Sequence, residues 1–173
     1  IDVSKWNGDI DWAKVKATDV DYAIIRCGYG DDEKSQDDPY WKTNADACTK
    51  EGIPFGTYIY SYADSVTAAK SEANHVLRLI KGYDLSYPIY YDLEENSVRE
   101  KLSTKEIAEV AQTFCSIIED AGYDVAVYAN KDWFTNYLTD SYFDTVDHWV
   151  AQYNSTCTYQ GEYLMWQCTD SGT

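Results

Sequence analysis

Short apolar runs alternate along this chain with segments whose apolar residues recur at helical spacing. Tyr22–Tyr29 (YAIIRCGY) and Phe55–Tyr62 (FGTYIYSY) are rich in β-branched and aromatic residues and have the length of buried strands. Val66–Ile80 places its apolar side chains three or four residues apart, which predicts an amphipathic helix. Ser103 with Glu106 three residues later forms a capping-box pattern, so a long helix is expected to begin there.

The same reasoning assigns elements along the whole chain. Predicted strands cover Ile1–Ser4, Tyr22–Tyr29, Phe55–Tyr62, Pro88–Leu93, Asp124–Tyr128, His148–Tyr153 and Leu164–Gln167. Predicted helices cover Asp11–Ala17, Asp38–Glu51, Val66–Ile80, 103–122 and Lys131–Leu138, with Gly52 and Gly122 as stop signals. Strand followed by helix, repeated about five times, predicts parallel strands joined by right-handed crossovers.

The last third of the chain departs from this alternation. Helices shorten or vanish after Leu138, so the final strands are expected to join by loops or hairpins, and Thr158–Gln167 is typical of a hairpin. We therefore predict an α/β fold, an irregular TIM-like β/α barrel of about eight strands with reduced helices in the last third. No GxGxxG after a strand, P-loop, internal repeat or linker is present, so residues 1–173 are predicted to be a single domain that binds no nucleotide.

The charge balance excludes some classes of partner. The formal net charge is −16 at pH 7, whereas nucleic-acid binding is dominated by Lys and Arg, so no nucleic-acid partner is expected. The same charge disfavours adsorption to an anionic membrane. No apolar run approaches the roughly 20 residues that span a bilayer, so no membrane insertion is expected. Because the chain starts at Ile1 rather than Met, we expect a mature or trimmed segment.

The five cysteines do not form a dense disulfide scaffold. Cys157 and Cys168 flank the predicted hairpin and are one possible pair, and Cys27 with Cys48 is a second; geometry decides both. None lies in a CxxC motif or a Cys/His cluster, so neither a metal nor another cofactor is predicted.

The chain has 17 Tyr and 6 Trp but only 4 Phe. Tyr and Trp combine an apolar face with a hydrogen-bonding edge, which suits a wet groove that stacks on sugar rings. The alternative is that Tyr replaces Phe in an ordinary core. Tyr60, Tyr128, Tyr153 and Trp166 lie near the carboxyl ends of predicted strands and are candidates to line such a saccharide groove, with core packing as the alternative for each.

The segment Tyr87-Pro-Ile-Tyr-Tyr-Asp-Leu-Glu-Glu-Asn96 carries the candidate chemistry. Side chains alternate along a strand, so Asp92 and Glu94 share one face and lie roughly 6.5–7 Å apart along the backbone. In a barrel, the carboxyl ends of the parallel strands hold the active site. Close carboxylates raise one another's pKa, which keeps a proton available for a glycosidic oxygen. The alternative for an isolated Asp-x-Glu is a solvated strand end.

The surrounding motifs resemble the family 25 glycoside hydrolases, the barrel-fold lysozymes (N-acetylmuramidases). The matching pieces, in the family's order, are Asp2-Val-Ser-Lys-Trp-Asn-Gly8 with Ile10-Asp11-Trp12, Ile24-Ile-Arg-Cys-Gly-Tyr-Gly30, Gly56-Thr-Tyr-Ile-Tyr-Ser-Tyr62, Pro88-Ile-Tyr-Tyr-Asp-Leu-Glu94, Val127-Tyr128, Trp149-Val-Ala-Gln-Tyr153 and Trp166-Gln167. Each piece is weak alone, but the ordered set covers essentially the whole chain.

The resemblance implies a catalytic β/α barrel that hydrolyses, with retention, the β-1,4 bond between N-acetylmuramic acid and N-acetylglucosamine in peptidoglycan. On the family pattern Glu94 matches the general acid/base. Asp92 matches the partner that assists the substrate's 2-acetamido group as internal nucleophile, and Asp2 matches an acidic residue lining the site. The expected partner is the peptidoglycan glycan strand, and the expected location is secreted or cell-wall-associated. The oligomeric state cannot be predicted from the sequence.

One departure from the family pattern concerns the end of the chain. Family members carry a further acidic residue on the last strand, and this chain stops before that position, so the domain is expected to be truncated just before its last strand. Asp170 lies in the preceding loop and is a poor substitute. Arg26 is expected either to bind substrate and pair with Asp2 inside the barrel or to form a surface salt bridge.

Two other functions remain open from the sequence. A non-catalytic cell-wall saccharide-binding barrel is consistent with the many aromatic residues and the missing acidic residue. A hydrolase of chitin or another N-acetylglucosamine polymer is consistent with the acetamido-assisted chemistry, although the chitinase signature DxxDxDxE is not present.

Overall fold

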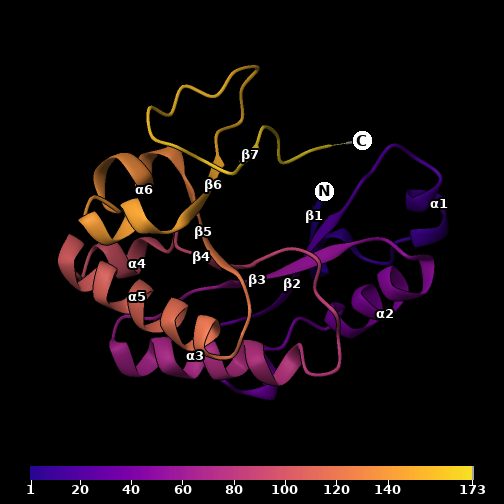
Figure 1. Cartoon of the computed structure of the whole chain (residues 1–173), viewed down its shortest axis with the longest axis horizontal. Helices are drawn as coiled ribbons and strands as arrows, with labels where there is room; N and C mark the ends of the chain where they lie inside the picture. Colours follow the sequence, from indigo (N-terminus) through magenta and orange to yellow (C-terminus); the bar gives the residue numbers. More distant parts are fainter. Residues whose placement is uncertain (173) are drawn as a thin grey trace.

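The computed structural model describes residues 1–172, and seven parallel strands form its one sheet. The strands are β1 (Asp2–Val3), β2 (Ala23–Tyr29), β3 (Phe55–Tyr60), β4 (Ile89–Asp92), β5 (Val125–Asn130), β6 (Asp147–Ala151) and β7 (Met165–Gln167). Their spatial order is their order in the chain, and every neighbouring pair is parallel. The sheet curls into a half-barrel (Figure 1). In the described residues β1 and β7 are its two edges, so the structure has seven strands where about eight were expected.

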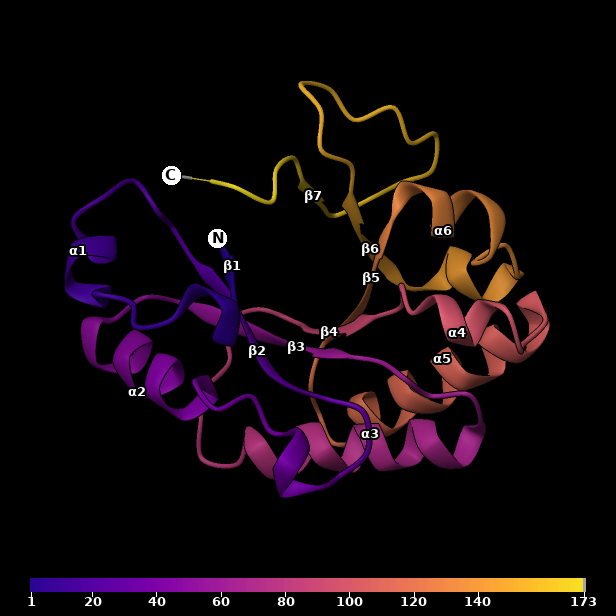
Figure 2. The ribbon, with the colours of Figure 1, turned by 180° about the vertical axis from the view of Figure 1, so that it is seen from behind.

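Helices follow most of the strands. The α-helices are α1 (Trp12–Lys16), α2 (Trp41–Glu51), α3 (Val66–Leu79), α4 (Asn96–Arg99), α5 (Thr104–Asp120) and α6 (Lys131–Asn136), and three short 3-10 helices are η1 (Lys5–Asn7), η2 (Lys34–Gln36) and η3 (Ser141–Thr145). Figures 1 and 2 show α2, α3 and α5 along the outer face of the curled sheet, while the loop before β7 and both chain ends lie on the other side. No helix among residues 1–172 is long and apolar enough to cross a membrane.

The longest helix, α5, begins where its sequence predicts. Ser103 Oγ accepts a hydrogen bond from Glu106 N at 3.3 Å, and Ser103 N donates to Glu106 Oε2 at 2.8 Å. This reciprocal pair satisfies backbone donors that a helix start leaves without partners. The helix stops at Ala121, and Gly122 follows with a φ of 88°. Its buried apolar face packs against α3 and the sheet, which fixes β4 and β5 from behind.

Alternation along the strands divides the apolar side chains into two clusters. The outer cluster lies between the sheet and the helices and contains Ile25, Ile59, Tyr91, Val127 and Val150. The inner cluster lies inside the curl and contains Ile24, Tyr90, Ala126, Tyr128, Trp149 and Ala151. On β4 this two-residue period sends Tyr91 outward and Tyr90 inward, so Asp92 faces the inside at the carboxyl end of the strand.

The prediction of a hairpin at Thr158–Gln167 is wrong. Strand β7 pairs with β6 in parallel, with Trp149 opposite Met165 and Ala151 opposite Gln167, and residues 152–164 form a loop without a regular element. A parallel neighbour must start at the same end of the sheet as its predecessor, so the chain has to travel back before it pairs.

Neither possible disulfide forms, because all five cysteines are free. Cys27, Cys48 and Cys115 are buried thiols of the outer cluster. Without the hairpin, no local geometry brings Cys157 and Cys168 together.

Candidate active site

Two carboxyl groups project into one small cavity at the carboxyl end of β4. Asp92, the last residue of the strand, is 3% exposed, and Glu94 follows two positions later in a half-buried position. Both line a cavity of about 220 Å³, together with Asp2 from β1 and Arg26 from β2. The structure therefore brings together the three acidic residues and the arginine that the sequence singled out.

Burial dominates the electrostatics of Asp92. Removal from water raises the pKa of Asp92 well above its ordinary value, and the nearby charges of Glu94 and Asp2 raise it further, whereas Arg26 opposes them. The Oδ1 atom of Asp92 is buried and accepts no hydrogen bond from any of the described residues. A substrate group that donates an N–H or O–H to this oxygen would satisfy it.

Glu94 is set up to hold a proton. Burial raises the pKa of Glu94, and the charge of Glu95 contributes in the same direction, while the side chain of Asn130 favours the ionised form. Asn130 ends β5 and caps α6 by accepting a hydrogen bond from Trp133 N at 3.0 Å, which fixes its place beside Glu94. A carboxyl group with a raised pKa keeps its proton to higher pH than a free one does, which is what a general acid requires.

Asp2 is connected to the far side of the cavity by Gln167. Gln167 Nε2 donates to both carboxylate oxygens of Asp2 at 3.1 Å, and Gln167 Oε1 accepts from the Tyr128 hydroxyl at 2.8 Å. Burial raises the pKa of Asp2, and the Gln167 hydrogen bonds oppose that shift. The chain Tyr128–Gln167–Asp2 thus spans from β5 through β7 to β1.

Arg26 pairs with Asp38, which the sequence analysis did not foresee. Arg26 Nε lies 2.7 Å from Asp38 Oδ2, and both side chains are buried. Asp38 also accepts hydrogen bonds from Lys5 N at 3.0 Å and from Tyr40 N at 2.9 Å. Neither expected partner, Asp2 or a surface acid, is correct; the pair is internal and anchors the turn after β1.

A third buried acid, Glu72 on α3, lies behind the cavity on the outer face of the sheet. Its carboxylate accepts hydrogen bonds from the Tyr91 hydroxyl at 2.5 Å, from Ser61 Oγ at 2.8 Å and from Tyr62 N at 2.8 Å. Burial raises the pKa of Glu72 to about 7 despite these donors. Glu72 thus holds the backbone just after β3 and is hydrogen-bonded to Tyr91, which precedes Asp92 on β4.

Aromatic side chains form the walls of the cavity. The rings that line it come from η1, β3, β5 and β6, and they are Trp6, Tyr58, Tyr60, Tyr128 and Trp149. The Tyr60 hydroxyl donates to Glu95 Oε2 at 3.1 Å, and Trp149 packs edge-on against Tyr58, Tyr90 and Tyr128. Polar edges and apolar faces together are what a sugar ring requires.

Two of the proposed substrate-binding residues lie outside this cavity. Tyr153 is 56% exposed, and its neighbours include Tyr128 and Glu94, so it stands at the rim. Trp166 faces away from the inside of the curl, because its neighbours Met165 and Gln167 on β7 face inward. Its Nε1 donates a hydrogen bond to Gln152 O at 2.9 Å. Tyr60, Tyr128 and Arg26 do line the cavity.

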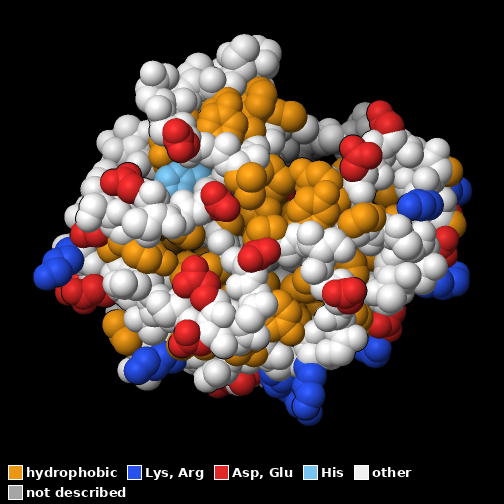
Figure 3. All heavy atoms as spheres, in the orientation of Figure 1, with side chains coloured by type: hydrophobic (Ala, Val, Ile, Leu, Met, Phe, Trp, Pro, Cys, Tyr) orange, Lys and Arg blue, Asp and Glu red, His pale blue; other side chains and the backbone are white. Residues whose placement is uncertain are grey.

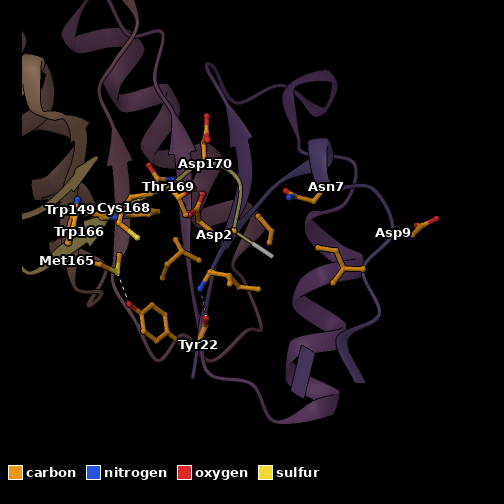
Figure 4. A pocket seen from close by; sticks show the side chains of 16 residues that line it. Asp2, Asn7, Asp9, Tyr22, Trp149, Met165, Trp166, Cys168, Thr169 and Asp170 are labelled. Carbon is orange, nitrogen blue, oxygen red and sulfur yellow. Dashed lines mark hydrogen bonds between the residues drawn. The ribbon is translucent and has the colours of Figure 1, made fainter. Parts of the chain in front are cut away.

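A larger cavity of about 620 Å³ lies between the two sheet edges, β1 and β7. Figure 4 shows Trp149, Met165, Trp166 and Cys168 on one side of the view, Asn7 and Asp9 on the other, and Asp2 between them. The Tyr22 hydroxyl reaches Met165 Sδ at 2.9 Å. Hydrophobic side chains gather in this region of the surface (Figure 3). Asp2 and Trp149 line both cavities, so the two adjoin one another.

Sequence reasoning missed several of these residues. Tyr58 and Trp149 carried a usable signal, because each shares a strand face with a residue that was identified as inward-facing. No sequence pattern indicated the roles of Gln167, Asn130 and Asp38, because the residues they contact are distant in the sequence. Among residues 1–172, no group of three or more His, Cys, Asp or Glu has an arrangement that could hold a metal ion.

Comparison with known proteins gives a consistent result. The sequence model of glycosyl hydrolases family 25 matches residues 1–173. The uncharacterized protein YegX of Escherichia coli O157:H7 is 31% identical over 159 residues, which are 88% of this chain and 55% of that protein. The chain thus spans about half the length of this curated relative.

Solved structures of similar proteins share the fold. The modular autolysin LytC of Streptococcus pneumoniae is 31% identical with a TM-score of 0.87, covering 100% of this chain and 42% of that one. LytC has also been solved in complex with a synthetic peptidoglycan ligand. A family 25 glycosyl hydrolase from Bacillus anthracis has a TM-score of 0.85 at 20% identity, covering 99% of this chain and 79% of that one, which shows the shared fold.

Proposed function

Because this chain belongs to glycosyl hydrolases family 25, we propose that it is a muramidase. It hydrolyses the β-1,4 bond between N-acetylmuramic acid and N-acetylglucosamine in peptidoglycan. The observation that carries the proposal is the pair Asp92 and Glu94, both with raised pKa values in one aromatic-walled cavity. The complex of LytC, at 31% identity, with a synthetic peptidoglycan ligand supports the choice of substrate.

In the first step Glu94 donates its proton to the glycosidic oxygen. The bond from C1 to that oxygen breaks, and the electron pair leaves with the oxygen as the new hydroxyl group. The carbonyl oxygen of the substrate's own 2-acetamido group then bonds to C1 and forms a cyclic oxazolinium ion. No side chain of the protein needs to attack C1.

Asp92 assists the acetamido group. Its buried Oδ1 accepts the acetamido N–H, which orients the carbonyl oxygen toward C1. Asp2, held by Gln167 on the adjacent wall, adds negative potential in the same cavity. In the second step water attacks C1 while Glu94 takes its proton. The bond from C1 to the acetamido oxygen breaks, and its electron pair restores the neutral acetamido group. The two inversions at C1 give net retention.

The site of action follows from the substrate. Peptidoglycan lies outside the cytoplasmic membrane, and we accordingly propose a secreted or cell-wall-associated enzyme. With a charge of −16, attraction between protein and an anionic cell wall is unfavourable, so short-range stacking and hydrogen bonds must hold the glycan.

The test is digestion of purified peptidoglycan followed by mass spectrometry of the products. Reducing ends on muramic acid are expected; reducing ends on glucosamine would contradict the assignment. Glu94→Gln should lose at least a hundredfold in activity, the range for removing a general acid, while Glu100→Gln, an exposed acid six positions later, should remain active. Binding without cleavage by the unmodified protein would identify a saccharide-binding barrel, and cleavage of chitin alone would identify the other hydrolase.

A further inference from the structure

The residues Lys5, Trp6, Tyr29 and Tyr62 form a surface beside the catalytic cavity, here called the Trp6 platform. Trp6 is 79% exposed and Tyr62 is 50% exposed, although both are large aromatic side chains. Neither belongs to a core cluster of the described residues. Core packing therefore does not explain these two rings.

The platform is a continuous chain of contacts. Lys5 Nζ lies 4.7 Å from the Trp6 ring centroid and 5.7 Å from that of Tyr29. The Tyr29 and Tyr62 rings meet edge to face at 6.2 Å. The Tyr62 ring also lies 5.1 Å from that of Tyr60. Trp6 lines the catalytic cavity, and so does Tyr60, the neighbour of Tyr62, so the platform borders that cavity.

Polar side chains fix the backbone under these rings. Asp38 accepts a hydrogen bond from Lys5 N, and the side chains of Ser4 and Asn7 close a capping box around the turn that carries Trp6. Glu72 accepts a hydrogen bond from Tyr62 N at 2.8 Å. Aromatic rings held in place before binding lose little conformational entropy when a ligand stacks on them.

Lys5 places a positive charge on the platform of a protein whose net charge is −16. Within the described part of the chain no carboxylate lies within ion-pair distance of its ammonium group, although 30 acidic residues are present. It lies over two rings instead. A free cation beside stacking faces suits a sugar that carries a carboxylate.

We propose that the Trp6 platform binds a further sugar residue of the glycan strand, at the edge of the cavity that holds the bond to be cleaved. Trp6 and Tyr62 stack on the sugar, and Lys5 pairs with a carboxylate of its lactyl-peptide substituent. This inference rests on the proposed function for the identity of the glycan. It goes beyond that function by assigning residues that have no role in the chemical step.

Substrate length separates this binding role from a role in catalysis. Trp6→Ala and Tyr62→Ala should each lower kcat/KM on an eight-residue glycan about tenfold more than on an aryl glycoside of N-acetylmuramic acid, mainly through KM. Tyr163→Ala, another exposed tyrosine (42%) in the loop before β7, should affect both substrates equally. Equal losses on both substrates with the platform variants, or no loss on either, would overturn the proposal.

A binding experiment separates this inference from the proposed function. Glu94→Gln removes the acid but leaves the platform intact, so calorimetry can measure its affinity for the eight-residue glycan. Adding Trp6→Ala should weaken that affinity about tenfold. If Trp6→Ala leaves the glycan affinity unchanged, the platform does not bind a sugar, whether or not the protein cleaves glycans. If the affinity falls, the platform binds a sugar even where no cleavage is detected.

The role of Lys5 has its own test in the same background. Lys5→Met keeps most of the side-chain stem and removes the charge. At low salt it should weaken binding to glycan that carries stem peptides more than binding to an N-acetylglucosamine oligomer of the same length, because the oligomer has neither lactyl nor peptide carboxylates. Equal weakening for both ligands would overturn the carboxylate assignment.

Discussion

The side-chain amide of Gln167 lies 3.1 Å from each carboxylate oxygen of Asp2, so the last strand of the sheet is hydrogen-bonded to the first across the inside of the curl. The same amide accepts from Tyr128 on β5. One side chain therefore sets the position of an active-site acid and joins the two edges of an open sheet.

Gln167→Leu should raise the pKa of Asp2, because the hydrogen bonds that favour its charged form disappear. If the reaction needs Asp2 ionised, the acidic limb of the pH–activity profile should move to higher pH by about 1 unit, equivalent to about 1.4 kcal/mol. The measurement is kcat/KM against pH on soluble glycan. Tyr128→Phe removes only the hydrogen bond from Tyr128 to Gln167, so the acidic limb should stay in place. An equal shift in both variants would show that the limb does not report the hydrogen bonds between Gln167 and Asp2.

Glu72 should make the protein less stable as the pH rises from about 4.5 to about 7. Its pKa is raised in the folded state, so between these values the unfolded chain releases a proton that the folded chain keeps. The free energy of unfolding should fall by about 3 kcal/mol from this group. Glu72→Gln should lack this slope, which urea denaturation at several pH values will measure, with the exposed Glu109→Gln as control. Parallel curves for wild type and Glu72→Gln would show that Glu72 does not titrate in this way.

Asp38→Asn should destabilise the protein by about 3–5 kcal/mol, because it leaves the buried Arg26 without a counter-ion. Replacing both partners, as Arg26→Met with Asp38→Leu, should recover much of the loss. Asp46→Asn, which breaks the exposed pair with Lys42, should cost less than about 1 kcal/mol. Denaturant unfolding measures all three, and a double variant no more stable than Asp38→Asn would contradict the ion-pair explanation.

The substrate's acetamido group should be indispensable. Glycan whose muramic residues are de-N-acetylated lacks the carbonyl oxygen that attacks C1, so it should resist cleavage even where it binds. With intact glycan, proton NMR should show the β-anomer as the first product. An initial α-anomer would mean inversion and would exclude the acetamido route.

Much of the architecture was predictable because it follows local rules. The two-residue period around Tyr90, Tyr91 and Asp92 sorts side chains between the inside of the curl and the helices, and it predicted that Asp92 and Glu94 share a face, as both line one cavity. The capping box at Ser103 fixed the start of the longest helix to the residue.

What escaped prediction depends on contacts that are distant in sequence. The pair of Arg26 with Asp38 and the bridge from Gln167 to Asp2 leave no periodic trace. The segment between β6 and β7 has neither a helical period nor a tight turn, so it suggested a hairpin where the strands are in fact parallel. Trp149 and Met165 lie opposite one another on these two parallel strands, inside the curl.

The side chain of Trp149 separates the two cavities described above and lines both of them. Its ring lines the cavity of about 220 Å³ that holds Asp92 and Glu94 and also the cavity of about 620 Å³ at the sheet edges. Any group that enters the larger space and displaces this indole reshapes the smaller one at the same moment. A substitution at the open edge that moves Trp149 would therefore also alter the cavity of Asp92 and Glu94.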